Sequence, residues 1–218
     1  MSNRFETPDI HEDLRVKLTT AFFEPGAKLK PSDLIGTYRC SANTIREILF
    51  RLAAAGLVAF EEQRGFRVRP VSPQRQHDLT SFRITLEQQG ACQSLRNSGL
   101  DWEARLTAAH HKLSHIEARI SASGEIESVL VPWCAAEWEF HETLVSASDS
   151  PILRETFRSI YDQFRQQLVT RARNYGYFEG NIAEHKTIVD AALAGDEAGL
   201  QQAIYDHLKR NLIPPAPG

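Results

Sequence analysis

Apolar residues recur with helical spacing along most of the chain and with a period of two in one short segment. The first predicted helix covers residues 9–23. Its apolar stripe recurs every four positions: Ile10, Leu14, Leu18 and Phe22. A Pro-Gly pair then breaks the pattern. Residues 32–38 predict a short second helix, for which Ser32 is a suitable N-cap.

A third predicted helix and a β-hairpin follow at once. The helix runs from Ser41, an N-cap residue, to Gly56, a typical C-terminal stop. Its inward side is apolar at Ile45, Leu49 and Leu52. Over residues 57–70 apolar and polar side chains alternate on both sides of Gln63-Arg64-Gly65, which predicts a hairpin with glycine at the turn.

From residue 73 onward the periodicity is helical throughout. The predicted helices cover residues 73–97, 101–123, 126–147, 150–174, 178–194 and 196–212. The links between them are short, as in an antiparallel bundle. Asp101 and Asp196 are suitable N-caps for two of the helices. The sequence therefore predicts a mainly α protein, with an N-terminal unit over residues 1–72 and an all-helical antiparallel bundle of about six helices over residues 73–218.

Three helices followed by a hairpin is the layout of a winged helix-turn-helix, whose third helix fits the major groove of B-DNA. The first turn of that helix must present short polar side chains and an arginine to base edges. The residues that meet this demand are Ser41, Asn43, Thr44 and Arg46. Arg64 and Gly65 at the hairpin tip suit the sugar-phosphate backbone or the minor groove. The alternative is a surface helix and hairpin with solvated charges.

Composition and charge agree with this division. The chain is 42% hydrophobic and 24% charged, which is typical of a globular protein. Its net charge is −3, but residues 1–72 carry eleven Lys/Arg against nine Asp/Glu. The excess of acidic residues therefore lies in the second unit, and the slightly basic first unit suits a polyanion.

Other features of the composition concern location. The three cysteines form no CxxC motif and are expected to be reduced thiols. No apolar run approaches the roughly 18 residues of a membrane span, and the N-terminus has no apolar signal region. We therefore expect a soluble, cytoplasmic protein with no membrane partner.

The segment "PGAKLKPSDLIGTYRCSANTIREILFRLAAAGLVAFEEQRGFRVRPVS" resembles the winged-helix domain of GntR-family bacterial transcription regulators. The resemblance covers most of residues 10–72. It includes a serine that opens the recognition helix, an Ile-Arg-Glu segment, and a "GLV" strand that leads to a glycine-tipped wing. One departure is Ala42, where family members often carry an arginine that contacts DNA. The departure gives Arg46 and the wing a larger share of the contacts and changes the expected operator sequence.

Four residues of the second unit have side chains that suit a metal ion. Glu137 and His141 lie four positions apart on one helix face, while His185 and His207 lie on two later helices. A carboxylate and three imidazoles that point inward from separate bundle helices are a plausible divalent metal site. Imidazole favours zinc, nickel, cobalt or iron. The alternative is that each histidine caps a helix end or forms a hydrogen bond in the core.

The second unit also resembles a known domain. An acidic-x-x-Phe-His motif, a Glu-His pair about forty residues on, a final histidine, "SDSPIL" and "GDEAGLQQAIYDHL" resemble the FCD effector domain of the FadR subgroup of GntR regulators. The resemblance covers residues 78–212, and six helices would match the shorter, VanR-like members. It implies zinc or nickel bound by Glu137, His141, His185 and His207. Members that bind metal carry Asp where this chain has Glu137, and the extra methylene moves the carboxylate across the metal or withdraws it.

Arg83 matches an arginine of the family that lies on the first helix of this domain, close to the effector. A guanidinium beside a metal is well suited to bind a carboxylate. The alternative is an ion pair with Glu87, four residues later. His111 and His115 are also four residues apart, but we expect them on an exposed helix face.

Together these features predict a ligand-responsive bacterial transcription regulator, a repressor and not an enzyme. It would bind a pseudo-palindromic double-stranded DNA operator as a homodimer, because one recognition helix reads few base pairs. A small organic acid or sugar acid would be its effector. One alternative is a metal-dependent hydrolase with Glu142 or Glu184 as base and the winged helix as an interaction module. The other is an architectural DNA-binding protein with a purely structural bundle.

Overall fold

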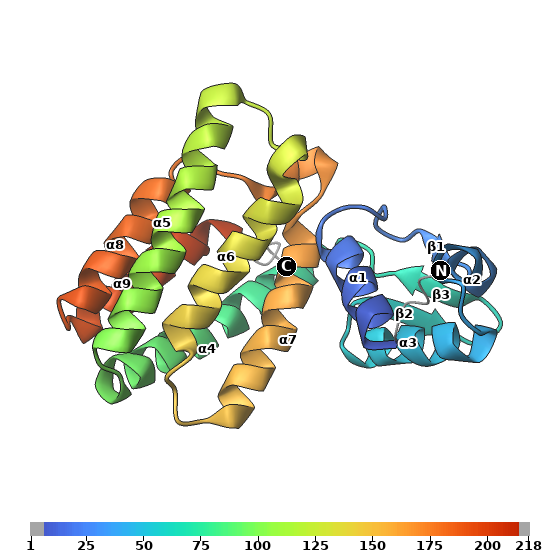
Figure 1. Cartoon of the computed structure of the whole chain (residues 1–218), viewed down its shortest axis with the longest axis horizontal. Helices are drawn as coiled ribbons and strands as arrows, with labels where there is room; N and C mark the ends of the chain where they lie inside the picture. Colours follow the sequence, from blue (N-terminus) through green and yellow to red (C-terminus); the bar gives the residue numbers. More distant parts are fainter. Residues whose placement is uncertain (1–6, 214–218) are drawn as a thin grey trace, which may run out of the picture.

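Two separate hydrophobic cores organise the structure, one in each unit of the chain (Figure 1). The computed structural model describes residues 7–213. The first core lies among three helices and a small sheet, and includes Ile10, Leu14, Ile45, Leu49 and Val68. The second core lies inside the helical bundle. The predicted succession of a small mixed unit and a helical unit is confirmed.

The first unit is a winged helix. Its elements are α1 (Thr7–Thr19), β1 (Lys28–Leu29), α2 (Pro31–Tyr38), α3 (Ala42–Ala54), β2 (Val58–Glu61) and β3 (Gly65–Val68). The strands are antiparallel in the order β1-β3-β2, and Glu61 lies opposite Gly65 at the hairpin end. The predicted hairpin is therefore confirmed. β1 adds a third strand to the sheet, and because it has only two residues, no alternation of apolar and polar positions could predict it.

The helix ends of this unit follow local chemistry. Ser41 caps α3 as predicted, because its Oγ accepts a hydrogen bond from the Thr44 backbone N–H at 3.1 Å. The prediction that Ser32 caps α2 is wrong. Pro31 occupies the first helical position, where its fixed φ and missing N–H are tolerated. The predicted extension of α1 to residue 23 is also wrong. Ala21 has a left-handed φ of 56° just after the helix, and Phe22 is 66% exposed.

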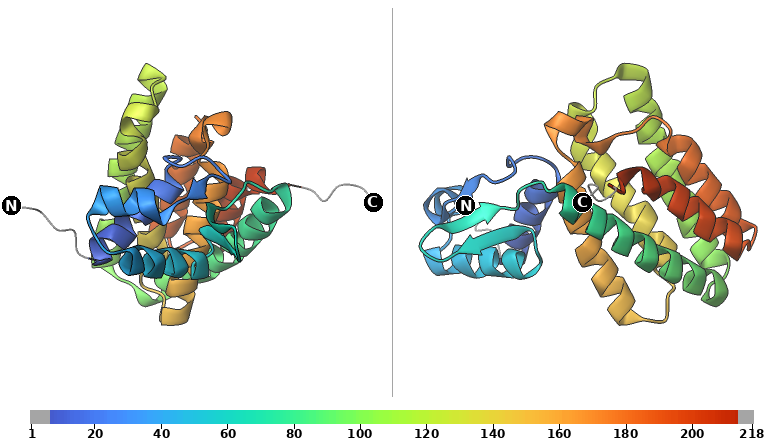
Figure 2. Two further views of the ribbon diagram at one scale, coloured as in Figure 1. Left: turned by 90° about the vertical axis from the view of Figure 1, so that its right-hand side faces the viewer. Right: turned by 180° about the vertical axis from the view of Figure 1, so that it is seen from behind.

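Six α-helices form the second unit in the described part of the chain, as predicted (Figure 2). They are α4 (Pro73–Asn97), α5 (Leu100–Ser123), α6 (Leu130–Val145), α7 (Pro151–Leu168), α8 (Asn181–Leu193) and α9 (Glu197–Leu208). Short 3-10 turns occupy Glu127–Val129, Arg171–Gly176 and Lys209–Asn211. Among residues 7–213, no helix combines the length and the apolarity needed to cross a lipid bilayer.

Two predicted boundaries in the bundle need correction. The helix predicted to reach residue 174 ends at Leu168, because Val169 leaves the helical conformation with a ψ of 82°. Asp101 is not the N-cap of α5. Gly99 holds that position, and Asp101 lies in the first turn, where a carboxylate still interacts favourably with the helix dipole. Asp196 caps α9 as predicted, accepting from the Gly199 N–H at 2.9 Å.

Helix α7 connects the two units. Figure 1 shows α1 beside α7, and the Arg15 Nη1 donates to Asp162 on α7 at 2.7 Å. Gln166 Nε2 donates to the backbone carbonyl of Leu57 at 2.9 Å. Gln167 Oε1 accepts from the backbone N–H of Ser72 at 2.9 Å. The orientation of the winged helix is therefore set largely by one face of α7.

Gly90 permits a close approach of α4 to its neighbours, and an alanine there should destabilise the bundle. A Cβ at Gly90 would lie 2.9 Å from Leu153 Cδ2 and 3.0 Å from Val145 Cβ. Alanine normally stabilises a helix by about 1 kcal/mol relative to glycine, but overpacking costs about 1–3 kcal/mol. We expect Gly90→Ala to lower the thermal unfolding midpoint of the bundle.

Gly36 is the matched control. It lies in α2, is exposed, and a Cβ there would meet no atom within 4 Å. Gly36→Ala should leave the midpoint unchanged or raise it. An equal rise in both variants would show that α4 has room for a methyl group at Gly90.

Candidate functional site

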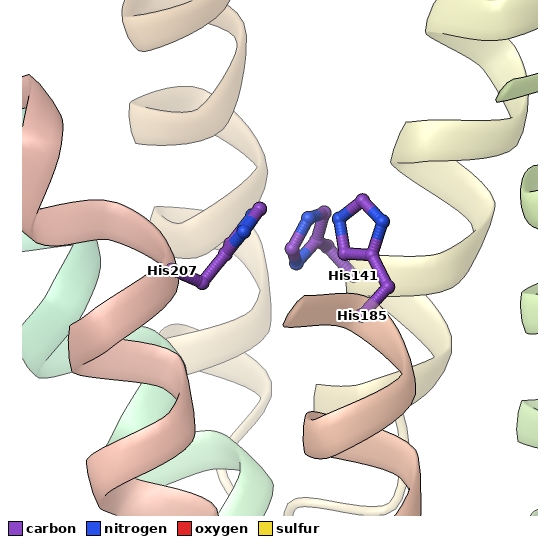
Figure 3. Close-up of side chains that lie close together, drawn as sticks. All are labelled: His141, His185 and His207. Carbon is purple, nitrogen blue, oxygen red and sulfur yellow. The ribbon is translucent and has the colours of Figure 1, made fainter. Parts of the chain in front are cut away.

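Three histidines from separate helices meet inside the bundle. His141 comes from α6, His185 from α8 and His207 from α9, and their rings face one another (Figure 3). One ring nitrogen of each lies within 4.8 Å of those of the other two. All three side chains are buried. The structure therefore brings together the three predicted imidazoles.

Each histidine is oriented by a glutamate on another helix. Nδ1 of His141 contacts Glu87 Oε1, Nδ1 of His185 lies 3.3 Å from Glu117 Oε2, and Nδ1 of His207 lies 2.9 Å from Glu184 Oε2. A carboxylate at Nδ1 holds the proton on that nitrogen and leaves the Nε2 lone pair free. This carboxylate–imidazole arrangement is the one that histidine ligands of metals commonly show.

The orienting role of these glutamates was not predicted. Glu117 did carry a detectable signal, because it lies on the apolar stripe of α5 between Leu113 and Ile120, where a charged side chain is out of place. From the sequence, Glu87 is expected only as an ion-pair partner of Arg83, and Glu184 only as the base of the alternative hydrolase. Neither pairing with a distant histidine can be read from the sequence.

The free atoms of the cluster fit a divalent cation. Nε2 of His141, Nε2 of His185 and Oε1 of Glu137 are buried and have no hydrogen-bond partner in the described part of the chain. An unsatisfied buried polar group costs about 1–3 kcal/mol. A cation that accepts these lone pairs would remove the cost, and nitrogen-rich sites suit zinc or nickel.

Glu137 lies beside the histidines but is shared with an arginine. Its Oε1 is 3.7 Å from His185 Nε2, and its Oε2 is 3.9 Å from His141 Nε2. Arg165 Nη1 is 3.5 Å from Oε2. Ligand atoms of Glu137, His185 and Glu117 lie within 4.8 Å of one another, but Glu137 does not lie within this distance of all three histidines. Its role as a fourth ligand stays a prediction.

Burial and neighbouring charges shift the pKa values of these groups in different directions. Burial, together with the Arg83 charge for His141 and the His185 charge for His207, holds the pKa of both well below 6.5. Burial alone would lower the pKa of His185, but its hydrogen bond to Glu117 and the Glu137 charge outweigh it and raise that pKa. Of the three histidines, His185 is therefore the one that retains a second proton most readily.

Arg83 forms the predicted ion pair and keeps a further donor, while its role as an effector ligand stays a prediction. Its Nε donates to Glu87 Oε2 at 3.0 Å, so the predicted local ion pair is present. Its Nη2, however, is buried and has no partner in the described structure. Arg83 also lines a cavity of about 30 Å³ with Glu137, His207 and Arg210. One side of the guanidinium thus holds Glu87, while the other offers a donor beside the histidines.

The predicted DNA-facing residues lie at the surface of the winged helix. Asn43 and Arg46 are exposed on the first turns of α3. The hydroxyls of Ser41 and Thr44 lie 2.8 Å apart, so part of their hydrogen-bonding capacity is used within the cap. At the wing, Arg64 is 76% exposed.

Gly65 follows the turn with a left-handed φ of 78°, a conformation that glycine adopts readily. The wing residues are therefore accessible, and their DNA contacts stay predictions.

The remaining candidates do not join the centre. His111 and His115 are exposed on α5, as expected. Glu142 is exposed on α6. Glu184 is held by His207 and by an ion pair with Arg210, which leaves it poorly placed to act as a free base.

Comparison with known proteins identifies both units. The family "FCD domain" matches residues 78–210, and the family "Bacterial regulatory proteins, gntR family" matches residues 7–68. The HTH-type transcriptional regulator BphR of Paraburkholderia xenovorans LB400 is 30% identical over 91% of this chain and 80% of its own length. The HTH-type transcriptional repressor GlaR of Escherichia coli K12 is 30% identical over 85% of this chain and 84% of its own length.

Solved structures share the fold at lower identity. Escherichia coli McbR/YncC superimposes with a TM-score of 0.79 at 20% identity, over 97% of this chain and 96% of that one. A putative transcriptional regulator GntR from Rhodococcus sp. RHA1 has a TM-score of 0.74 at 24% identity, over 94% of each chain. The arrangement of the two units is thus found in solved proteins.

The histidine trio predicts metal binding that depends on His185. Protein purified without chelator should contain about one divalent transition metal ion per chain, and His185→Ala should lose it, because a three-imidazole site loses a ligand. Mass spectrometry of the metal content measures both. The exposed His111→Ala variant is the control and should retain the metal. Equal metal content in the His185 variant would place the ion elsewhere.

Metal uptake should release a proton from His185. His141 and His207 have lowered pKa values and are already neutral at pH 7, whereas the pKa of His185 is raised above 6.5. A metal requires neutral imidazole. Zinc titration into metal-free protein should therefore release at most one proton per chain from the trio, and progressively less as the pH rises through the raised pKa of His185. Calorimetry in buffers of different ionisation enthalpy measures this. Release of two or three protons would contradict the assignment.

Proposed function

The chain belongs to the gntR family of bacterial regulatory proteins and carries an FCD domain, and we propose that it is a repressor controlled by a small carboxylate metabolite bound at a metal centre in the bundle. The observation that carries this proposal is a set of buried polar atoms at the histidine trio that lack partners in the described part of the chain: Arg83 Nη2 and the Nε2 atoms of His141 and His185. Arg83 and His207 also line a small cavity there. The relative GlaR is named as a transcriptional repressor. The proposal that this chain represses transcription agrees with that name.

The DNA-binding part of the proposal rests on α3 and the wing. Two copies of the chain would bind the two halves of a pseudo-palindromic operator, because a single recognition helix contacts too few base pairs for genomic specificity. Asn43 and Arg46 would reach base edges in the major groove, and Arg64 would contact the phosphate backbone. We place the domain boundary after residue 72, at the N-cap of α4. A cytoplasmic location follows from binding to a bacterial chromosome.

The effector part rests on complementary donors. A zinc or nickel ion held by His141, His185 and His207 would act as a Lewis acid toward a carboxylate. Arg83 Nη2 offers a charge-assisted hydrogen bond to the same anion. The cavity of about 30 Å³ accommodates only a small head group, which favours a small organic acid or sugar acid.

A physical route joins the effector centre to the winged helix. Arg165 on α7 contacts Glu137 at 3.5 Å and donates to Cys134 Sγ at 3.2 Å. The next two residues of α7, Gln166 and Gln167, bind the backbone of the first unit. An anion that displaces the Glu137 carboxylate would alter its pairing with Arg165. We propose that the resulting shift of α7 changes the spacing of the two recognition helices.

The hydrolase alternative has no support from the family. The relatives are transcription regulators. Glu184, one of the two residues that could act as a base, already contacts His207 and forms an ion pair with Arg210.

Removal of Arg46 should weaken operator binding. Arg46 is exposed on the first turns of α3, and loss of an arginine contact to a base typically costs about 1–3 kcal/mol, which corresponds to about 5-fold to 150-fold in affinity. Fluorescence anisotropy with DNA from upstream of the protein's own gene measures the effect. Arg51→Ala is the matched control, since Arg51 lies at the end of α3 and pairs with Glu47 at 2.6 Å. If both variants bind like wild type, α3 does not read DNA in the proposed manner.

Arg83→Lys should uncouple the effector from DNA binding. Lysine keeps a charge beside Glu87 but loses the second donor of the guanidinium fork. In a panel of small organic acids and sugar acids, an active acid should reduce the operator affinity of metal-loaded wild-type protein about tenfold. The variant should bind operator normally and respond much less. A full response in the variant would exclude Arg83 as an effector ligand.

A further inference from the structure

A second and larger cavity lies between the winged helix and the bundle. It has a volume of about 310 Å³, is lined mainly by α1, α6 and α7, and opens to solvent on one side. None of the three clustered histidines lines it, and Arg165 is shared with the small cavity of the bundle. Known small-molecule sites have volumes of about 300–1,000 Å³ and favour domain interfaces. The cavity therefore has the size and the position of a ligand site.

The walls are mainly apolar, with an aromatic side. Val16 from α1 and Val131 and Ala135 from α6 contribute to the apolar lining. The Trp138 ring forms part of the wall, and the Arg158 guanidinium lies over it with 4.1 Å between Cζ and the ring centroid. An apolar or aromatic molecule would bury its surface here without leaving polar groups of its own unpaired.

The charges of the lining residues favour one anion. Arg15 is neutralised by Glu12 and Asp162, because its three donor nitrogens all bind their carboxylates at 2.6–2.8 Å. Arg158 makes no hydrogen bond within residues 7–213, and its nearest carboxylate oxygen, on Asp162, is 3.7 Å from Nε. Arg158 thus stands at the aromatic wall with one loose ion pair to Asp162, and its donors have no hydrogen-bond partner in the described part of the chain.

Two further polar atoms of the lining residues are unsatisfied. The Tyr161 hydroxyl and the Arg165 Nε are buried and have no hydrogen-bond partner in the described part of the chain. Both residues line the cavity, and their exposed fractions are 2% and 5%. Buried donors without partners are rare in folded proteins, and a ligand is one of the groups that satisfies them.

We propose that this interdomain cavity is a second ligand site, which binds a small molecule with an apolar or aromatic body and a single anionic head group. Arg158 is the anchor for the anion, and Trp138 and the valines contact the body. A bound molecule would contact α1 and α7 at once, so it would stabilise one arrangement of the two units. This regulatory consequence, though not the binding itself, rests on the proposed function.

The test uses 2-naphthoate and its uncharged isostere 2-naphthamide on the full, metal-free chain. Isothermal titration calorimetry should show one naphthoate per chain and an affinity for the amide about tenfold lower, because the amide lacks the charge-assisted hydrogen bond. Arg158→Gln should bind the acid about tenfold more weakly and should no longer prefer it over the amide. Ala135→Trp, which fills the cavity from an exposed position of α6, should abolish binding of both compounds.

Two controls separate this site from the bundle centre. Ala118→Trp introduces the same side chain at an exposed position of α5 outside the cavity and should bind like wild type. His185→Ala should also retain binding. The proposal is overturned if neither compound binds at millimolar concentration, or if binding survives Ala135→Trp and is lost in the His185 variant. No DNA is present, so these outcomes are independent of operator recognition.

Discussion

The buried pairing of imidazoles with carboxylates is the constraint on which the bundle depends. Three imidazole rings are buried inside the bundle beside its hydrophobic core, and each requires a hydrogen-bond partner there, because an unpaired buried polar group is costly. Glutamates from α4, α5 and α8 supply the partners. Five of the six bundle helices are thereby tied to one point. The same pairings orient the Nε2 atoms toward one another, so the contacts that satisfy the buried imidazoles also leave nitrogen lone pairs available for the proposed metal ion.

Helix α7 supplies no histidine to this centre, but it connects the centre with the winged helix. Arg165 contacts Glu137 on the inner side, and Asp162, Gln166 and Gln167 bind the winged helix on the outer side. The small bundle cavity and the larger interdomain cavity both include Arg165 in their walls. Both cavities therefore adjoin one helix that also contacts the winged helix, and the proposed coupling between a ligand and α3 would act through this helix.

The division of chemistry between the two units accounts for their different surfaces. In the winged helix, Arg46 and Arg64 lie at the surface, and Arg64 pairs only with the nearby Glu61, as contacts to DNA require. The bundle buries Arg83 and Arg165 beside carboxylates and aromatic rings. Solved structures of low sequence identity share this architecture.

The sequence by itself determined the order of elements, the cap at Ser41, the hairpin and the identity of the three histidines, because these depend on local spacing and on residue chemistry. It misjudged the ends of α1 and α7, where a single residue leaves the helical conformation without a glycine or proline to announce it. Only the tertiary structure decided the glutamate partners, the sharing of Glu137 with Arg165 and the interdomain cavity. Each of these joins residues far apart in the chain, and their proximity follows from the packing of whole helices.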